Sequence, residues 1–291
     1  MLEWDYTIRR RERTIPMRNA IRWILIILCV AAFCYSAFML LSTLFEYRQA
    51  DRFYDRTALQ YATVVSPTPQ VSQQKPDVSL PGKDREDISA PPAIEEPESK
   101  LPSAPIAVDF ASLLELNSEV VGWLYCGDTV INYPIVRAED NNKYLHRMLD
   151  GSYNSSGTLF MDYRCESDFT SGNSLIYGHN MKNGSMFHTL LEYRDQTFYD
   201  EHPAMFLLTP EQNYRLNIVA GFITIADSWV YQTDLSETGA PEAFLNQCIA
   251  NSDFRSSYRP APEEQIITLS TCTYEYNNAR YVIIGTLTPI E

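Results

Sequence analysis

The stretch "TLSTCTYEYNNARYV", residues 268–282, decides the fold class because it reads as a β-hairpin that carries reactive side chains. Side chains alternate along the strand-like run "EQIITLSTC", so Ser270 and Cys272 share one face. Two asparagines then supply a turn, and the chain returns through "RYVIIGTL". We expect the two runs to pair antiparallel, which places Cys272 opposite Arg280 with strand axes about 4.8 Å apart.

Outward from this hairpin, short strand-like runs fill most of the C-terminal part of the chain. They are "VGWLYCGDTVINYPIV", which holds two strands around a Gly-Asp turn, "GTLFMDY", "NSLIYG", "AMFLLTP" and "YRLNIVAGFITI". Helical patterns are few: "DFASLLELN" with Asp109 as N-cap, and "PEAFLNQCIANSDF" in the connection before the run that ends at Cys272. Many short strands with few helices predict a mainly β fold that closes into a barrel, because closure removes exposed edges.

The N-terminal part of the chain is typical of a membrane anchor. Residues 23–45, "WILIILCVAAFCYSAFMLLSTLF", carry no charge, and a helix of about 20 residues spans the hydrocarbon core. A cleaved signal peptide is the alternative, but the apolar run is longer than usual and no clear small-residue cleavage site follows. Residues 1–22 hold six arginines against three acidic residues, so we expect a cytoplasmic N-terminus, a single span and an extracellular C-terminal domain.

Composition divides the remainder into a tether and a globular domain. Residues 46–107 are read as an extracellular tether, because the part from residue 64 onward is rich in Pro, Ser and charge and cannot bury enough apolar surface to fold. Residues 108–291 are long enough for one domain with its own core, to which we expect the anchor and tether to contribute nothing. Without residues 1–22, which carry +3, the rest of the chain has a formal charge of −17, which argues against nucleic acid as a partner of the main domain, since phosphate binding requires clustered Lys and Arg.

A second candidate feature is "LIYGHNMKNGSMFHTLL", residues 175–191. An apolar strand ends at Tyr177, Gly178 permits a tight exit, and His179 follows at the shoulder. Rigid strand ends of this kind often carry catalytic side chains. Each residue also has a structural reading, because a lone cysteine is often a small core residue and lone histidines and arginines usually lie at the surface.

The cysteines and histidines show no metal-binding pattern. The six cysteines lie at wide, irregular spacing without a CxxC pair, and no HExxH motif occurs. Two disulfides among the four outer cysteines are possible on number alone, but the spacing favours free thiols. We therefore expect no metal and no cofactor.

Several motifs together resemble a class B sortase. "TLSTC" followed by "NARYV" matches the family signature TLxTC with a downstream arginine, and "YGHNMKNGSMF", "VVGWL", "INYPIV" and "YLHRMLDGSYNSSGTLFMDYR" match as well. The resemblance covers residues from about 109 to the C-terminus. It implies an eight-stranded sortase barrel with N-terminal helices and a helix before the catalytic strand, in the envelope of a Gram-positive bacterium.

The resemblance also implies roles for individual residues. By it, Cys272 is the nucleophile, His179 the acid and base, and Arg280 the group that stabilises the transition state, while Ser270 contacts the sorting signal and Tyr177 lines the pocket. The implied reaction cleaves a surface protein's C-terminal sorting signal after threonine, forms a thioester, and transfers the protein to a peptidoglycan precursor amine. The cation-bearing partners fit this chemistry, since an unassisted cysteine with a pKa of about 8.5 is mostly protonated at neutral pH.

Other functions stay open at the level of the sequence. A surface cysteine protease or a pilin-polymerising sortase would use the same residues. An L,D-transpeptidase is disfavoured because no His-Gly-Cys occurs. A tethered, non-catalytic wall-binding domain is the alternative from another class, and it would leave the Cys272 thiol buried.

Overall fold

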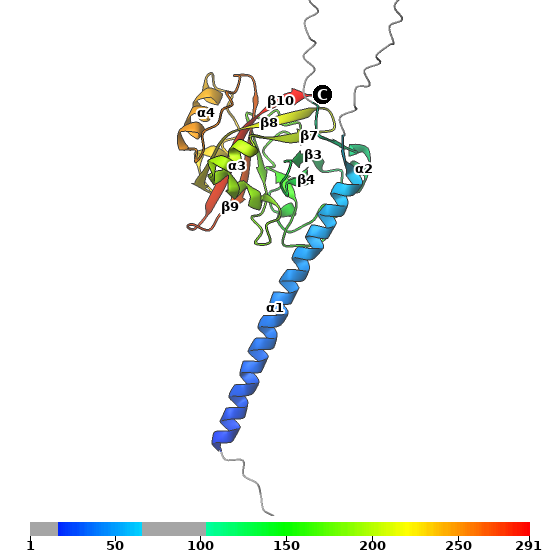
Figure 1. Cartoon of the computed structure of the whole chain (residues 1–291), viewed down its shortest axis with the longest axis vertical. Coiled ribbons are helices and arrows are strands. Elements are labelled where there is room, and N and C mark those ends of the chain that lie inside the picture. The colour runs from blue at the N-terminus through cyan, green and yellow to red at the C-terminus, as the bar shows by residue number, and fades with distance from the viewer. Residues whose placement is uncertain (1–16, 66–102) are drawn as a thin grey trace, which may run out of the picture. The chain divides into compact units, whose positions relative to one another are not determined.

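The computed structural model describes residues 17–65 and 103–291, which fall into two compact units divided between residues 49 and 50. In the first unit the described part is helical and belongs to α1 (Met17–Tyr61), the long helix drawn in blue in Figure 1. Residues Ile21–Tyr61 of this helix include an 18-residue window with a mean hydropathy of 2.7, none of it buried. Length and composition therefore make α1 a candidate membrane span.

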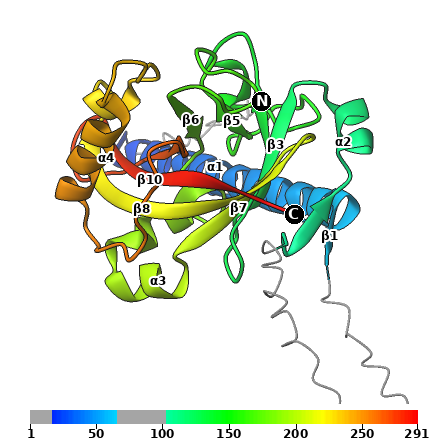
Figure 2. The same ribbon diagram turned by 90° about the horizontal axis from the view of Figure 1, so that it is seen from above.

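The second unit is a closed barrel of eight strands, as the sequence predicted (Figure 2). The strands are β3 (Val120–Tyr125), β4 (Asn132–Arg137), β5 (Leu159–Met161), β6 (Asn173–Tyr177), β7 (Ala204–Leu208), β8 (Asn213–Ile225), β9 (Gln265–Cys272) and β10 (Ala279–Ile290). Their order around the barrel is β10-β8-β7-β3-β4-β5-β6-β9, and β9 pairs with β10 to close it. Each strand matches a run that the sequence predicted.

Strand direction determines which ends of the strands meet. Neighbouring strands are antiparallel except for the pairs β4–β5 and β6–β9, which are parallel. Parallel pairing brings the C-terminal ends of β6 and β9 to one edge of the barrel, and antiparallel pairing brings the start of β10 to the same edge. The predicted reactive residues all lie at this edge.

Short helices and 3-10 segments lie between the strands along the chain. They are α2 (Phe110–Leu116), α3 (Gln196–Glu201), α4 (Ala240–Asn251) and the 3-10 segments η1 (Lys143–Leu145), η2 (Phe187–Arg194) and η3 (Trp229–Tyr231). Asp109 caps α2 as predicted, because its carboxylate accepts the backbone N–H of Ser112. The predicted helix before β9 is α4, whose Phe244 and Cys248 pack with Ala220 of β8. Figure 2 shows α4 beside β8 and β10.

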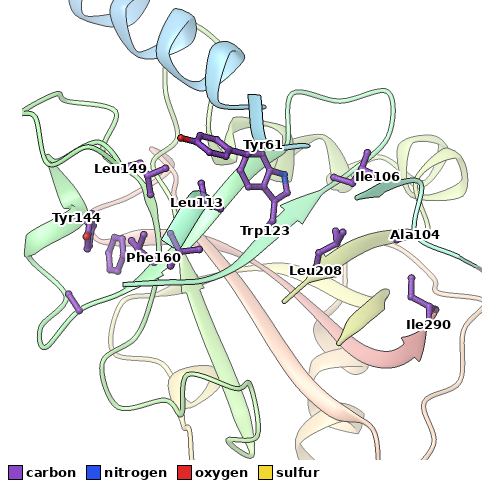
Figure 3. Close-up of a cluster of buried hydrophobic side chains, with 13 residues drawn as sticks. Tyr61, Ala104, Ile106, Leu113, Trp123, Tyr144, Leu149, Phe160, Leu208 and Ile290 are labelled. Carbon is purple, nitrogen blue, oxygen red and sulfur yellow. The ribbon is translucent and has the colours of Figure 1, made fainter. Parts of the chain in front are cut away.

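The predicted tether and domain boundary differ from the structure. Residues 46–61 continue α1, and β1 (Ala62–Val64) pairs antiparallel with β2 (Ile106–Val108). Tyr61 and Ile106 are buried in one cluster with Trp123 of β3, so segments outside residues 108–291 contribute to the core (Figure 3). The aromatic side chains of α1 near residue 61 supply the apolar surface that the Pro-rich segment lacks. Residues 66–102, the rest of the predicted tether, lie outside the described residues.

Candidate active site

Cys272 and Arg280 face each other across the hairpin that ends the chain. Cys272 is the last residue of β9, and its partner in the antiparallel register with β10 is Arg280, as predicted from the sequence. Both side chains are half-buried. The Arg280 guanidinium donates to the Ala279 carbonyl at 3.0 Å and makes no ion pair within residues 17–65 and 103–291. Its other donors therefore have no carboxylate competing for them.

The connection between these two residues is held by Arg194 at the end of η2. The Arg194 guanidinium donates to Thr273 Oγ1 at 3.1 Å and pairs with the Glu275 carboxylate at 2.5 Å. It also lies 5.1 Å from the ring centroid of Tyr281 on β10, a cation–π contact. These contacts hold the chain that separates Cys272 from Arg280.

His179 reaches the same edge through the parallel pairing of β6 with β9. In that register Tyr177 stands beside Ser270, so the chain that follows Tyr177 runs alongside the end of β9. Gly178 continues the pairing, because its N–H donates to the Ser270 carbonyl at 3.1 Å and its own carbonyl accepts the Thr271 hydroxyl at 2.8 Å. A Cβ atom at residue 178 would lie 2.6 Å from the Phe187 ring, so the packing of Phe187 against the backbone here requires glycine.

The surroundings of His179 determine its protonation. Its Nε2 lies 2.7 Å from the Leu145 carbonyl oxygen. Because a carbonyl can only accept, Nε2 carries the proton and Nδ1 of the neutral ring is free to accept one. The ring stacks on His146 at a centroid distance of 5.7 Å. Burial, together with the neighbouring His146, lowers the pKa of His179 below its ordinary value despite the Leu145 hydrogen bond.

One pocket of about 210 Å³ contains all five residues that the sequence singled out. Its lining is Asn141, Leu145, Phe160, Tyr177, Gly178, His179, Ala226, Tyr231, Ser270, Thr271, Cys272 and Arg280. The pocket thus combines a thiol, an imidazole and a guanidinium with an aromatic and aliphatic wall. A mostly apolar wall with a few convergent polar groups is typical of a ligand-binding pocket.

Ser270 and Tyr177 are bound to neighbours rather than free. The Ser270 hydroxyl lies 2.9 Å from the Tyr231 hydroxyl, and the Tyr231 ring stacks with that of Tyr177. The Tyr177 hydroxyl donates to the buried Asp162 carboxylate at 2.9 Å, which Arg164 also binds. Burial and the nearby carboxylate raise the pKa of Tyr177. The ring of Tyr177, rather than its hydroxyl, is thus available to a ligand.

Sequence reasoning missed three residues at this site. Asn180 donates from Nδ2 to the Cys272 carbonyl at 3.0 Å, and its Oδ1 lies 2.7 Å from His188 Nδ1, so it connects the His179 segment to the end of β9. Its position directly after His179 in "YGHN" could have identified Asn180 as a site residue from the sequence. Leu145 contributes only a backbone carbonyl, and Tyr231 lies in a connection without a helical or strand pattern. The sequence therefore gave no reason to assign either residue to the site.

Three of the other cysteines are shielded from reagents by burial. All six are unpaired. Cys126, Cys165 and Cys248 are buried, and burial raises the pKa of each thiol. Cys272, half-buried at the pocket, is the one thiol of the second unit within reach of a ligand.

Comparison with known proteins agrees with this geometry. The family profile described as "Sortase domain" matches residues 126–288, more than half of the chain. The chain is also 38% identical over 181 residues to Sortase B of Listeria monocytogenes, an alignment that covers 62% of this chain and 74% of that protein. The chain belongs to the sortase family and is a cysteine transpeptidase.

Solved structures place it within the family. The crystal structure of Staphylococcus aureus sortase B is similar with a TM-score of 0.59 and 27% identity, covering 62% of this chain and 87% of that one. Sortase B from Bacillus anthracis in complex with AAEK1 gives a TM-score of 0.58 and 33% identity, covering 66% and 90%. Together with the Listeria relative, these structures make the protein a class B sortase.

Proposed function

We propose that the protein is a membrane-anchored sortase that cleaves a sorting signal after threonine and transfers the surface protein to a peptidoglycan precursor amine. The observation that carries this proposal is the convergence of Cys272, His179 and Arg280 on one pocket from three strand ends. A nucleophile, a base and a rigid cation are the parts that acyl transfer through a thioester requires.

Acylation uses the free nitrogen of His179. Cys272 Sγ attacks the threonine carbonyl carbon while its proton passes to Nδ1, the nitrogen not engaged by Leu145. The C–N bond of the tetrahedral intermediate then breaks, and the imidazolium returns that proton to the departing amine. A thioester on Cys272 and a free amine result.

Arg280 stabilises the charge that appears in between. The carbonyl oxygen becomes an oxyanion in the tetrahedral intermediate, and a guanidinium presents several donors in a fixed plane. The absence of a carboxylate partner among the described residues leaves Arg280 available for this charge. A backbone N–H near the cysteine is the second donor that we assign to the oxyanion.

The pocket wall binds the peptide that precedes the scissile bond. We assign to Ser270 a contact with the sorting signal and to the ring of Tyr177 a place in the lining. The hydrogen bond between the hydroxyls of Ser270 and Tyr231 keeps these side chains oriented before substrate arrives.

Deacylation repeats the chemistry with a different nucleophile. An amine nitrogen attacks the thioester carbon, its proton moves to His179, the C–S bond breaks, and the sulfur of Cys272 regains a proton. One S. aureus structure is described as a sortase B–substrate complex, and another structure as sortase B complexed with triglycine. These relatives support a peptide substrate and an amine-bearing acceptor for this chain.

The location follows from the N-terminal segment. The apolar span of α1 anchors the protein, and the arginines before it keep the N-terminus in the cytoplasm. The catalytic unit is then extracellular, on the side of the membrane where peptidoglycan lies.

The test is transfer to an amine. The full chain in detergent micelles is incubated with a panel of Thr-containing sorting peptides, with and without triglycine, and products are identified by mass spectrometry. The proposal predicts an amide between the threonine carbonyl and triglycine. Hydrolysis alone at every triglycine concentration would instead identify a cysteine protease.

A further inference from the structure

The C-terminal part of α1, residues 50–61, packs on the catalytic unit through a buried face. Tyr54 and Thr57 on this face are 4% and 5% exposed. Tyr54 lies outside the active-site pocket, and the proposed chemistry does not use its hydroxyl. A buried tyrosine hydroxyl normally has a specific partner, so its contacts identify what it holds.

The Tyr54 hydroxyl binds the segment that carries the partner of His179. It donates to the Gly157 carbonyl at 2.5 Å and lies 2.9 Å from Thr158 Oγ1. Thr158 in turn donates from its hydroxyl to the Arg147 carbonyl at 2.8 Å and from its N–H to the Tyr144 carbonyl at 3.1 Å. Residues 144–147 are thereby fixed on both sides of the Leu145 carbonyl.

That carbonyl is the acceptor for His179 Nε2 at 2.7 Å, and the adjacent His146 stacks on the imidazole. Three hydrogen bonds, joined by short pieces of backbone, thus connect Tyr54 to the His179 ring. They are Tyr54 to Gly157, Thr158 to Tyr144, and His179 to Leu145. Loss of the Tyr54 hydrogen bond loosens the segment that carries the Leu145 carbonyl, without removing any group that touches the His179 ring.

A second route connects the same tyrosine to the backbone of His179. The Tyr54 ring makes an edge contact with Tyr133 at 5.3 Å, and the Tyr133 hydroxyl accepts the N–H of Met186 at 3.2 Å. The next residue, Phe187, donates its N–H to the His179 carbonyl at 2.9 Å. On the same helix face, the Asp51 carboxylate accepts from Asn183 at 3.0 Å, within the connection after His179.

We propose that Tyr54 is a positioning residue for His179, so that the helix that carries the apolar span also orients the catalytic imidazole. This inference rests on the proposed acid and base role of His179. The segment 50–61 then has a function in catalysis beyond anchoring, because it holds both stretches of chain that surround the ring.

The test compares Tyr54→Phe with Thr57→Val in the full chain in detergent micelles. Both changes remove one buried hydroxyl from the same helix, but Thr57 donates only to Phe53 within that helix. Each variant is assayed with the sorting peptide selected by the panel above, made as a Thr-Gly amide and as the matched p-nitrophenyl ester. The ester needs no leaving-group proton, so its rate depends less on His179, which still accepts the proton of the Cys272 thiol.

We expect Tyr54→Phe to lower kcat on the amide by about tenfold, since small misplacement of a catalytic group is costly, and to change the ester rate by less than about threefold. Thr57→Val should leave both rates within about twofold of the wild type. Equal loss on amide and ester by Tyr54→Phe, or amide rates matching those of Thr57→Val, would overturn the inference.

His179→Ala is measured in parallel to separate two kinds of failure. Wild-type amide cleavage by His179→Ala would refute the role of His179 itself, whereas a slow His179→Ala beside an unaffected Tyr54→Phe would refute only the positioning. Asp51→Ala, which removes the acceptor for Asn183, is the second variant should Tyr54→Phe unfold, with exposed Asp55→Ala as its control. The same amide-selective loss is expected for Asp51→Ala, and its absence there would overturn the inference.

Discussion

Arg280 stands directly opposite Cys272 in the antiparallel register of β9 and β10. The two residues lie at the ends of their strands and line one pocket, where the guanidinium has no carboxylate partner among the described residues. A cation held at a fixed strand position beside a nucleophile is preorganised for the charge that acyl transfer creates.

Arg280→Lys is predicted to slow acylation by about 10²-fold although the charge is kept, the scale seen when one oxyanion donor is removed. An ammonium on a flexible stem cannot reproduce the planar donors of a guanidinium. Single-turnover acylation measures the effect, and exposed Arg259→Lys, outside the pocket, is the control. Wild-type acylation by Arg280→Lys would remove Arg280 from the mechanism.

His179→Ala is predicted to fail in a different way. It removes the group that protonates the leaving amine, so an amide substrate should react slowly while an activated ester of the same peptide is partly rescued. Arg280→Lys should show no such rescue, because both substrates pass through an oxyanion. Matched amide and ester rates for the two variants decide this, and equal rescue of both would mean that their roles are wrongly assigned.

The pH dependence of acylation follows from the lowered pKa of His179. Nδ1 accepts the thiol proton only when the imidazole is neutral, which holds at pH values above its pKa in the folded protein. Burial lowers that pKa below the ordinary 6.5, so the acidic limb of kcat/KM should lie below pH 6.5. A profile of kcat/KM between pH 4 and 8 tests this. Activity that requires protonated His179, and so rises toward acid, would contradict the assignment.

Thiol accessibility should single out Cys272. In the full chain with Cys29 and Cys34 of α1 replaced by serine, iodoacetamide is expected to add one label, because the other three thiols are buried. Intact mass gives the number of labels and peptide mapping gives the site. An unreactive Cys272 would favour the non-catalytic wall-binding domain that the sequence left open.

The local part of the site was predictable from the sequence. Alternation along residues 264–272, the Asn-Asn turn and the return strand together fix the pairing of Cys272 with Arg280, because all of this information lies within one hairpin. His179 was a candidate from the strand end that precedes it, and its role came from the resemblance of "YGHNMKNGSMF" to class B sortases. The eight strands of the barrel were likewise visible as separate runs of apolar and β-branched residues.

The part built from distant contacts was not predictable. The acceptor for His179 is the backbone carbonyl of Leu145, which no side-chain pattern reveals. The predicted start of the catalytic unit, residue 108, lies too far along the chain. The Pro-rich composition begins only near residue 64, but the predicted tether was extended back to residue 46 and so included the aromatic C-terminal end of α1. Tyr54 and Tyr61 are buried there by partners that lie far along the sequence, including Gly157 and Trp123.

The most direct test of the account is detection of the acyl-enzyme on Cys272. The full chain is incubated with the Thr-containing peptide panel in the absence of an amine, and intact mass spectrometry and peptide mapping locate any adduct. We predict an adduct with the mass of the peptide up to its threonine, attached to Cys272 and released by hydroxylamine. It should be lost in Cys272→Ala and retained in Cys126→Ala, Cys165→Ala and Cys248→Ala. An adduct that persists in Cys272→Ala, or that maps to another residue, would contradict the account.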